Sequence, residues 1–113
     1  MKYKGSCHCK NIEFEVETNL EKIVQCNCSI CIRRNAKMIM IPKENFTLFK
    51  GESDLALYQF NSNVAKHYFC KECGIYTHHN RKSDPNGMGV NLGCIEELDA
   101  TEYDAIAFDG RKL

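Results

Sequence analysis

Seven of the eight cysteines in this 113-residue chain fall into three tight groups, and thiols at such spacing are typical ligands of metal ions. The groups are C-H-C at residues 7–9, C-N-C-S-I-C at residues 26–31 and C-K-E-C-G at residues 70–74. In an extended segment residues i and i+2 point to the same side, so Cys7 and Cys9 can offer two sulfurs to one ion. A C-x-x-C turn folds back so that both of its sulfurs reach one ion, and Gly74 lets the backbone leave the turn.

Two pairs of cysteines would complete a site with four thiolates, the closed coordination of structural zinc, and the spacing allows two arrangements. In the first, the group at residues 7–9 joins the group at residues 70–74, and the central group forms a separate site with three sulfurs. In the second, the central group shares its cysteines with one of the outer groups. A zinc ion bound by the central group alone keeps a fourth position for water, a substrate or a distant ligand. The competing interpretation is that both ions only hold a small domain together.

A disulfide framework is the other common use of many cysteines in a short chain. Residues 1–7 contain no apolar run of the kind that a secretory signal needs, so we expect a cytoplasmic protein. Structural disulfides are rare in a reducing compartment, and the two cysteines of a C-x-C segment are poor partners for one another. We therefore expect metal thiolates.

Composition excludes several classes of protein. The 15 Lys and Arg residues balance 15 Asp and Glu residues, whereas binding to nucleic acid or to a membrane surface calls for a basic excess. No stretch approaches the roughly 18 apolar residues of a membrane span. A hydrophobic content of 43% with 2 prolines argues against disorder. A chain of 113 residues is long enough for one core, so we expect a single domain over residues 1–113.

Alternation of apolar and polar residues dominates the chain and predicts a mostly β fold. The clearest strand has Ile12, Phe14 and Val16 on one side and glutamates on the other. Further strands are expected at residues 21–25, 38–41, 46–49, 55–60, 64–69, 75–78, 89–92 and 105–108. The strands at 64–69 and 75–78 flank the C-x-x-C turn and predict a hairpin closed by a metal. Short helical turns are expected at residues 30–37 and 95–101.

The cysteine groups stand in segments that resemble the glutathione-dependent formaldehyde-activating enzyme family, which includes centromere protein V. K-Y-K-G-S-C-H-C at residues 2–9, C-N-C-S-I-C-I-R-R at 26–34 and F-C-K-E-C-G-I-Y at 69–76 are similar to its three thiol motifs. S-D-P at residues 83–85 and G-V-N-L-G-C-I at 89–95 resemble the centromere protein V-like branch, and F-D-G-R at 108–111 the family's ending. The resemblance implies an Mss4-like fold, in which small β-sheets are pinned by zinc. Lys10 departs from the pattern, because the family usually has glycine there.

The resemblance favours the first arrangement of cysteines and implies two Zn²⁺ ions per chain. It implies a structural zinc on the outer groups, with the ligands Cys7, Cys9, Cys70 and Cys73. It implies a second zinc, where thiol chemistry takes place, on the central group of Cys26, Cys28 and Cys31. The family joins glutathione to formaldehyde, a reaction classed in reverse as that of a carbon–sulfur lyase. We therefore expect a zinc-dependent carbon–sulfur lyase whose partners are a small thiol such as glutathione and a small aldehyde, with the thiol held as thiolate.

Several other residues are candidates for this site. Arg33 and Arg34 follow the central group and could hold an anionic thiol, or they could form a solvated surface. His78 and His79 are adjacent in a predicted strand and face opposite sides, so one of them could shuttle protons at the open zinc. His67 is expected to face solvent or a neighbouring strand.

Cys94 lies outside the three groups, and three roles are open for it. It could be a core cysteine, a fourth ligand or close neighbour of the second zinc, or a redox nucleophile. The last role would resemble methionine sulfoxide reductases of the B type, which share the Mss4-like fold. The alternative to an enzyme is a noncatalytic zinc-stabilised interaction module, which the centromere protein V branch suggests.

Overall fold

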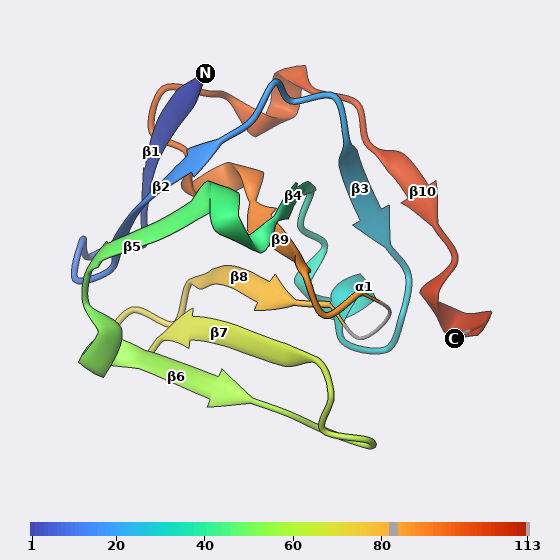
Figure 1. The fold of residues 1–113 in the computed structure, drawn as a ribbon. Helices are drawn as coiled ribbons and strands as arrows, with labels where there is room; N and C mark the ends of the chain where they lie inside the picture. Colours follow the sequence, from blue (N-terminus) through green and yellow to red (C-terminus); the bar gives the residue numbers. More distant parts are fainter. Residues whose placement is uncertain (82–83, 113) are drawn as a thin grey trace.

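The computed structural model describes residues 1–81 and 84–112, which form two β-sheets joined by loops and short helical turns (Figure 1). Ser83, part of one quoted motif, lies outside these residues. The smaller sheet has the order β1-β2-β5, with antiparallel pairings throughout. Its strands are β1 (Lys2–Ser6), β2 (Glu13–Glu17) and β5 (Phe46–Lys50). The strand predicted from alternating apolar residues and glutamates is confirmed as β2. The sequence pattern did not predict β1.

The larger sheet has seven strands among the described residues, in the order β10-β3-β4-β9-β8-β7-β6. These strands are β3 (Ile23–Cys26), β4 (Met38–Pro42), β6 (Leu55–Tyr58), β7 (Lys66–Cys70), β8 (Tyr76–Asn80), β9 (Gly87–Asn91) and β10 (Ile106–Phe108). β10 runs parallel to β3, and the other neighbouring pairs are antiparallel. β7 and β8 form the predicted hairpin around the C-x-x-C turn. The predicted fold class, mostly β, is confirmed.

Helical structure in the described ranges consists of short turns. The α-helix α1 (Cys31–Arg34) lies within the predicted segment 30–37 and ends at Asn35, whose φ of 51° is left-handed. The 3₁₀ turns are η1 (Lys43–Asn45), η2 (Glu52–Asp54), η3 (Leu92–Cys94), η4 (Ala100–Glu102) and η5 (Gly110–Lys112). Of the helical turn predicted at residues 95–101, only the end is helical, where η4 begins at Ala100, and Ile95 forms a β-bridge with Gly5 instead. Burial of the Ile95 side chain in the core outweighs the weak helix propensity of so short a segment.

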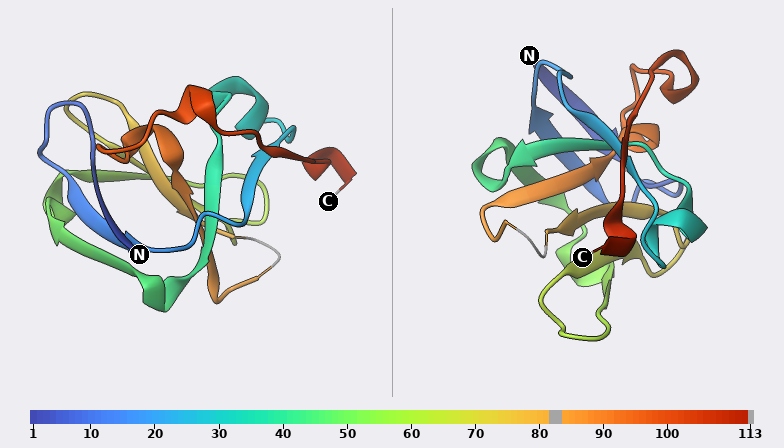
Figure 2. Two further views of the ribbon diagram at one scale, coloured as in Figure 1. Left: turned by 90° about the horizontal axis from the view of Figure 1, so that it is seen from above. Right: turned by 90° about the vertical axis from the view of Figure 1, so that its right-hand side faces the viewer.

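The core lies between the two sheets, which contribute apolar side chains from their facing sides (Figure 2). Phe14 and Val16 reach the core from β2, and Ile39 and Val90 reach it from β4 and β9. None of these four side chains is more than 1% exposed. The small sheet therefore covers one face of the large sheet. The opposite face of the large sheet is left available for a site.

His78 of β8 points into this core, where its ring centroid lies 4.6 Å from that of Phe46 and 4.7 Å from that of Tyr68. Burial lowers the pKa of His78 from its ordinary value of 6.5 to about 4. The unfolded chain therefore binds this proton first as the pH falls below 6.5, and the free energy of unfolding decreases from there to about pH 4.

A His78→Phe variant removes this titration while keeping an aromatic ring in the core. Between pH 6.5 and pH 5 the free energy of unfolding of the wild-type protein is expected to fall by about 2 kcal/mol more than that of the variant. Urea unfolding of both chains at the two pH values measures the difference, and acid effects on the thiols cancel because both chains share them. Parallel losses in the two proteins would contradict the prediction.

The face of the large sheet that points away from the core carries a different row of residues. Met40 of β4 pairs with Gly89 of β9, Gly89 pairs with His79 of β8, and His79 pairs with His67 of β7. Residues paired across a ladder share a face of the sheet, so these positions lie side by side. His78 and His79 face opposite sides, as predicted.

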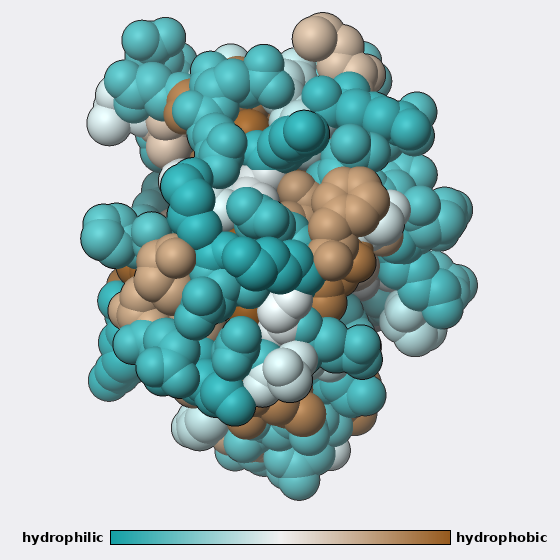
Figure 3. All heavy atoms as spheres, turned by 90° about the vertical axis from the view of Figure 1, so that its left-hand side faces the viewer, coloured by the Kyte–Doolittle hydropathy of each residue, from teal (hydrophilic) through white to brown (hydrophobic). Residues whose placement is uncertain are grey.

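The molecular surface drawn in Figure 3 is mainly hydrophilic, with apolar side chains in small separate patches. Throughout residues 1–81 and 84–112, every helix is too short and too polar to cross a membrane.

Candidate functional site

The outer cysteine groups meet in space and bring four sulfur atoms within 4.8 Å of one another. They are contributed by the loop after β1 and by the turn between β7 and β8, as Cys7, Cys9, Cys70 and Cys73. The Cys9 sulfur lies 3.6 Å from the sulfurs of Cys7 and Cys70. Two thiolates on a tetrahedral zinc with bonds of about 2.3 Å stand about 3.8 Å apart, whereas a disulfide needs about 2.05 Å. The first arrangement of cysteines is therefore the one that forms, and its geometry fits a closed metal site.

Backbone N–H groups support these sulfurs. Ile12 N donates to the Cys7 sulfur at 3.3 Å, and Cys73 N donates to the Cys70 sulfur at 3.5 Å. Such bonds favour the charged thiolate that a metal requires. Gly74 leaves the turn with a φ of 79°, as predicted, and Lys10 adopts a φ of 67° in the turn after Cys9. Glycine adopts this left-handed conformation without steric cost, which explains why it suits the Lys10 position.

The central group brings together three sulfurs, also within 4.8 Å of one another. Cys26 ends β3, Cys28 follows in the loop and Cys31 begins α1. Cys28 N donates to the Cys26 sulfur at 3.4 Å, and Cys31 N donates to the Cys28 sulfur at 3.5 Å. Among the described residues no fourth His, Cys, Asp or Glu joins this group within the same distance. The cluster fits a metal ion that retains an open coordination position.

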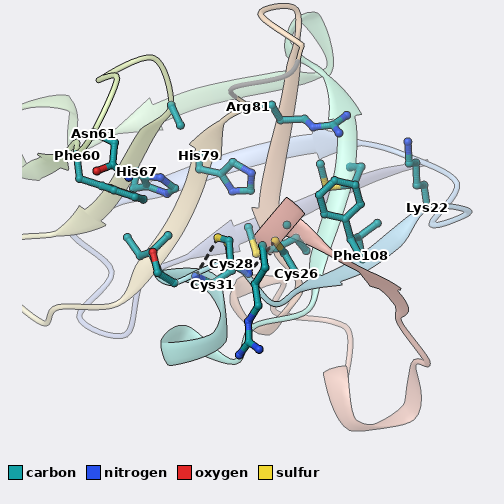
Figure 4. A pocket seen from close by; sticks show the side chains of 18 residues that line it. Lys22, Cys26, Cys28, Cys31, Phe60, Asn61, His67, His79, Arg81 and Phe108 are labelled. Carbon is teal, nitrogen blue, oxygen red and sulfur yellow. Dashed lines mark hydrogen bonds between the residues drawn. The ribbon is translucent and has the colours of Figure 1, made fainter. Parts of the chain in front are cut away.

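The three sulfurs face a pocket of about 480 Å³ on the free face of the large sheet (Figure 4). His79, Met40 and Met38 contribute to its floor, and Ser29 and Ile30 of the loop before α1 also line it. A volume of this size is typical of a small-molecule site. All three cysteines of the second cluster are partly exposed and face this pocket, whereas the first cluster combines Cys7 and Cys70, at most 2% exposed, with the exposed Cys9 and the partly exposed Cys73.

The C-terminal segment forms another wall of this pocket, and Asn27 holds it there. Asn27 N donates to the Phe108 carbonyl at 3.1 Å, and Asn27 Nδ2 donates to Asp109 Oδ1 at 3.1 Å. Arg111 N donates to Asn27 Oδ1 at 3.2 Å, and its Nε donates to the Asn27 carbonyl at 3.1 Å. A Cβ atom at Gly110 would lie 2.4 Å from the Cys26 sulfur, so this close approach requires glycine. The F-D-G-R ending thus packs directly on the central cysteine group.

Two neutral histidines line the pocket opposite the cysteines. Arg34 Nη1 donates to His67 Nδ1 at 3.2 Å, and the Tyr76 hydroxyl lies 2.5 Å from His79 Nδ1. Burial, followed by the charge of Arg34, lowers the pKa of His67 to about 4. Burial, followed by the charges of His67 and Arg34, lowers the pKa of His79 to about 3. His67 is only 4% exposed, so the expectation that it faces solvent is wrong, whereas its contact with the neighbouring strand is confirmed.

The two candidate arginines differ in their surroundings. Arg34 lies 3.8 Å above the centre of the Tyr76 ring and reaches His67. Arg33 is exposed and donates to the Ser29 carbonyl at 2.7 Å, and neither arginine is among the described residues that line the pocket. The cations that do line it are ones that sequence reasoning missed: Lys22, Arg81 and Arg111. Of these three residues, only Arg111 belongs to a motif noted in the sequence, the D-G-R ending.

Cys94 is a core cysteine. It is 6% exposed, and its thiol donates to the Tyr76 carbonyl at 3.5 Å. Burial, followed by the charges of Cys7 and Cys73, raises the pKa of Cys94 to about 12. It lies outside both clusters and outside the pocket lining, so its role as fourth ligand of the second site is wrong. A buried, protonated thiol is also a poor redox nucleophile.

Comparison with known proteins agrees with this geometry. The sequence model of glutathione-dependent formaldehyde-activating enzymes matches residues 2–109. The crystal structure of a Rhodobacter sphaeroides protein, a structural genomics target, is similar to this chain with a TM-score of 0.87 and 38% sequence identity. That similarity covers 95% of this chain and 98% of the other.

Proposed function

The chain belongs to the glutathione-dependent formaldehyde-activating enzyme family, and from this premise we propose that it is a zinc-dependent carbon–sulfur lyase acting on a glutathione-type thiol adduct. The observation that carries the proposal is the three-sulfur cluster of Cys26, Cys28 and Cys31, which opens into a pocket of about 480 Å³. A purely structural metal site would have no need of an open position facing a cavity.

In this proposal Cys26, Cys28 and Cys31 hold one zinc ion, and the outer groups hold the other. A zinc ion held by these three sulfurs would lower the pKa of a substrate thiol and would stabilise the thiolate near an electrophilic carbonyl. Lys22, Arg81 and Arg111 bring positive charge to the pocket, and among its described lining residues there is no Asp or Glu. These side chains would attract the carboxylates of a thiol such as glutathione.

His79 is placed to hydrogen-bond the oxygen that gains or loses a proton in the reaction, because burial keeps its ring neutral. In the forward direction the thiol sulfur bonds to the carbonyl carbon, and the former carbonyl oxygen takes up a proton. Because Nδ1 of His79 lies against the Tyr76 hydroxyl, its Nε2 is the ring atom left to donate a hydrogen bond to that oxygen. Arg34 donates a hydrogen bond to His67 and packs over the Tyr76 ring. It therefore holds in place two side chains that lie beside the His79 ring.

NMR exchange spectroscopy of glutathione and formaldehyde, with and without the zinc-loaded protein, tests the proposal. We expect the protein to accelerate exchange between free thiol and S-(hydroxymethyl)glutathione over the spontaneous rate. Cys28→Ser is the matched control, because it removes one ligand of the central cluster and leaves the outer four sulfurs in place. Absence of acceleration with two zinc ions per chain verified by elemental analysis would overturn the lyase assignment and favour a noncatalytic interaction module.

Substitution of Gly89 by alanine should remove the hydrogen bond from His79 and leave both sets of sulfur atoms in place. A Cβ atom there would lie 2.3 Å from Cε1 of His79, so the ring has to turn away from its present position. We expect exchange to slow by about tenfold or more with the zinc content unchanged. Histidine ring NMR signals report the displacement independently, and an unchanged exchange rate with a shifted His79 signal would exclude His79 from catalysis.

A further inference from the structure

One side of the pocket is apolar and has no part in the proposed chemistry. Val24 of β3 pairs with Met38 of β4, and Met40 follows on the same face of β4. Phe108 of β10 pairs with Cys26. All four side chains line the pocket, and we call them the apolar wall.

The apolar wall stands immediately beside the second cysteine cluster. Figure 4 shows Phe108 next to Cys26, on the opposite side of the cluster from His67. Any carbon group bonded to a sulfur at this cluster therefore has the wall as its neighbour. The charged part of a thiol has other partners, because Lys22 and Arg81 also line the pocket.

A one-carbon unit is too small to cover this wall. Its volume is comparable to the roughly 30 Å³ that a water molecule occupies in the liquid, a small part of the pocket. Methionine side chains adapt to apolar ligands of varied shape, and covering their surface is favourable in proportion to the area removed from water. The wall is therefore suited to a substrate with a longer apolar group.

We infer that the site takes the adduct of an anionic thiol with an apolar aldehyde of several carbons, whose chain or ring lies on the apolar wall. The inference rests on the proposed function and narrows its substrate class. In the lyase direction the C–S bond of the thiohemiacetal breaks and its electron pair stays on sulfur. The hydroxyl proton leaves the oxygen as the carbonyl forms, and the released thiolate takes up a proton. The step needs no oxidant or reductant.

Binding of S-alkyl glutathiones tests the apolar wall without any reaction, because a thioether cannot release an aldehyde. We expect the affinity for zinc-loaded protein to rise by about tenfold or more from S-methylglutathione to S-hexylglutathione. With ¹³C-methyl methionine, the signals of Met38 and Met40 should shift on binding. Met88, which belongs to the core and not to the pocket, is the internal control.

Met40→Asn should abolish the dependence of affinity on chain length. The matched control is Leu57→Asn, the same introduction of an amide at an exposed position on β6 outside the pocket lining. If S-hexylglutathione binds no more tightly than S-methylglutathione, or if the signals of Met38 and Met40 do not move, the inference is overturned.

Exchange measured with glutathione and a series from formaldehyde to hexanal separates this inference from the proposed function. Greater acceleration for hexanal than for formaldehyde supports both. Acceleration for formaldehyde only supports the lyase and overturns the inference. Tighter binding of the longer thioether without acceleration for any aldehyde supports the apolar subsite and overturns the lyase.

Discussion

A Cys70→Ser chain is expected to lose its cooperative thermal unfolding transition together with the metal of the outer cluster. Cys70 is fully buried at the end of β7, and its sulfur meets that of Cys9 across 61 residues of sequence. In small zinc domains the metal contributes about 10–16 kcal/mol of apparent binding energy, as much as the entire stability of a domain at about 5–15 kcal/mol. Serine does not supply a comparable ligand beside the buried thiol of Cys7.

Circular dichroism during heating, combined with elemental analysis, measures this effect. Cys28→Ser is the matched comparison, because the same atom is replaced in the accessible cluster, which lies outside the core. That chain should keep one zinc ion and melt close to the wild-type temperature. The opposite ranking, with Cys28→Ser the less stable of the two, would refute the division into a structural and an open cluster.

Gly110→Ala should remove the second metal site without changing any of its ligands. The added methyl group would stand 2.4 Å from the Cys26 sulfur and 3.0 Å from Cys28 Cβ, both in the loop that holds the cluster. Either the C-terminal segment lifts from Asn27 or the two cysteines move apart. A zinc ion tolerates deviations of only a few tenths of an ångström in its distances to the three sulfurs. We therefore expect about tenfold or greater loss of affinity for zinc at the second site.

Titration with a chromophoric chelator measures the two zinc affinities separately. Ala107→Ser adds one atom of similar size at an exposed position of β10 and serves as the control. The outer cluster should be unaffected in both variants. Normal loading of the second site in Gly110→Ala would show that the C-terminal segment is not part of the site.

Local patterns in the sequence predicted most of the strands and the convergence of sulfurs within each cysteine group. The hairpin around the C-x-x-C turn and the opposite orientation of His78 and His79 follow from a period of two, which depends only on backbone geometry. The helical turn predicted at residues 95–101 is confined to its end, where η4 begins, because burial of Ile95 against β1 is a long-range effect. The two arginines of α1 diverge because successive residues in a helix point about 100° apart, so only Arg34 reaches Tyr76.

The sequence by itself determined which cysteines could share an ion inside each group, since spacings of two and three residues fix where neighbouring sulfurs point. Spacing alone left open how groups about sixty residues apart would combine, and the family resemblance favoured the arrangement that the folded chain has. Only the tertiary structure decided the rest of the site. Lys22, Arg81 and Arg111 come together because β3, β8 and the segment after β10 meet at one face of the large sheet. The same packing places Gly110 against Cys26 and Phe108 beside it, contacts that depend on strand order and that no local pattern encodes.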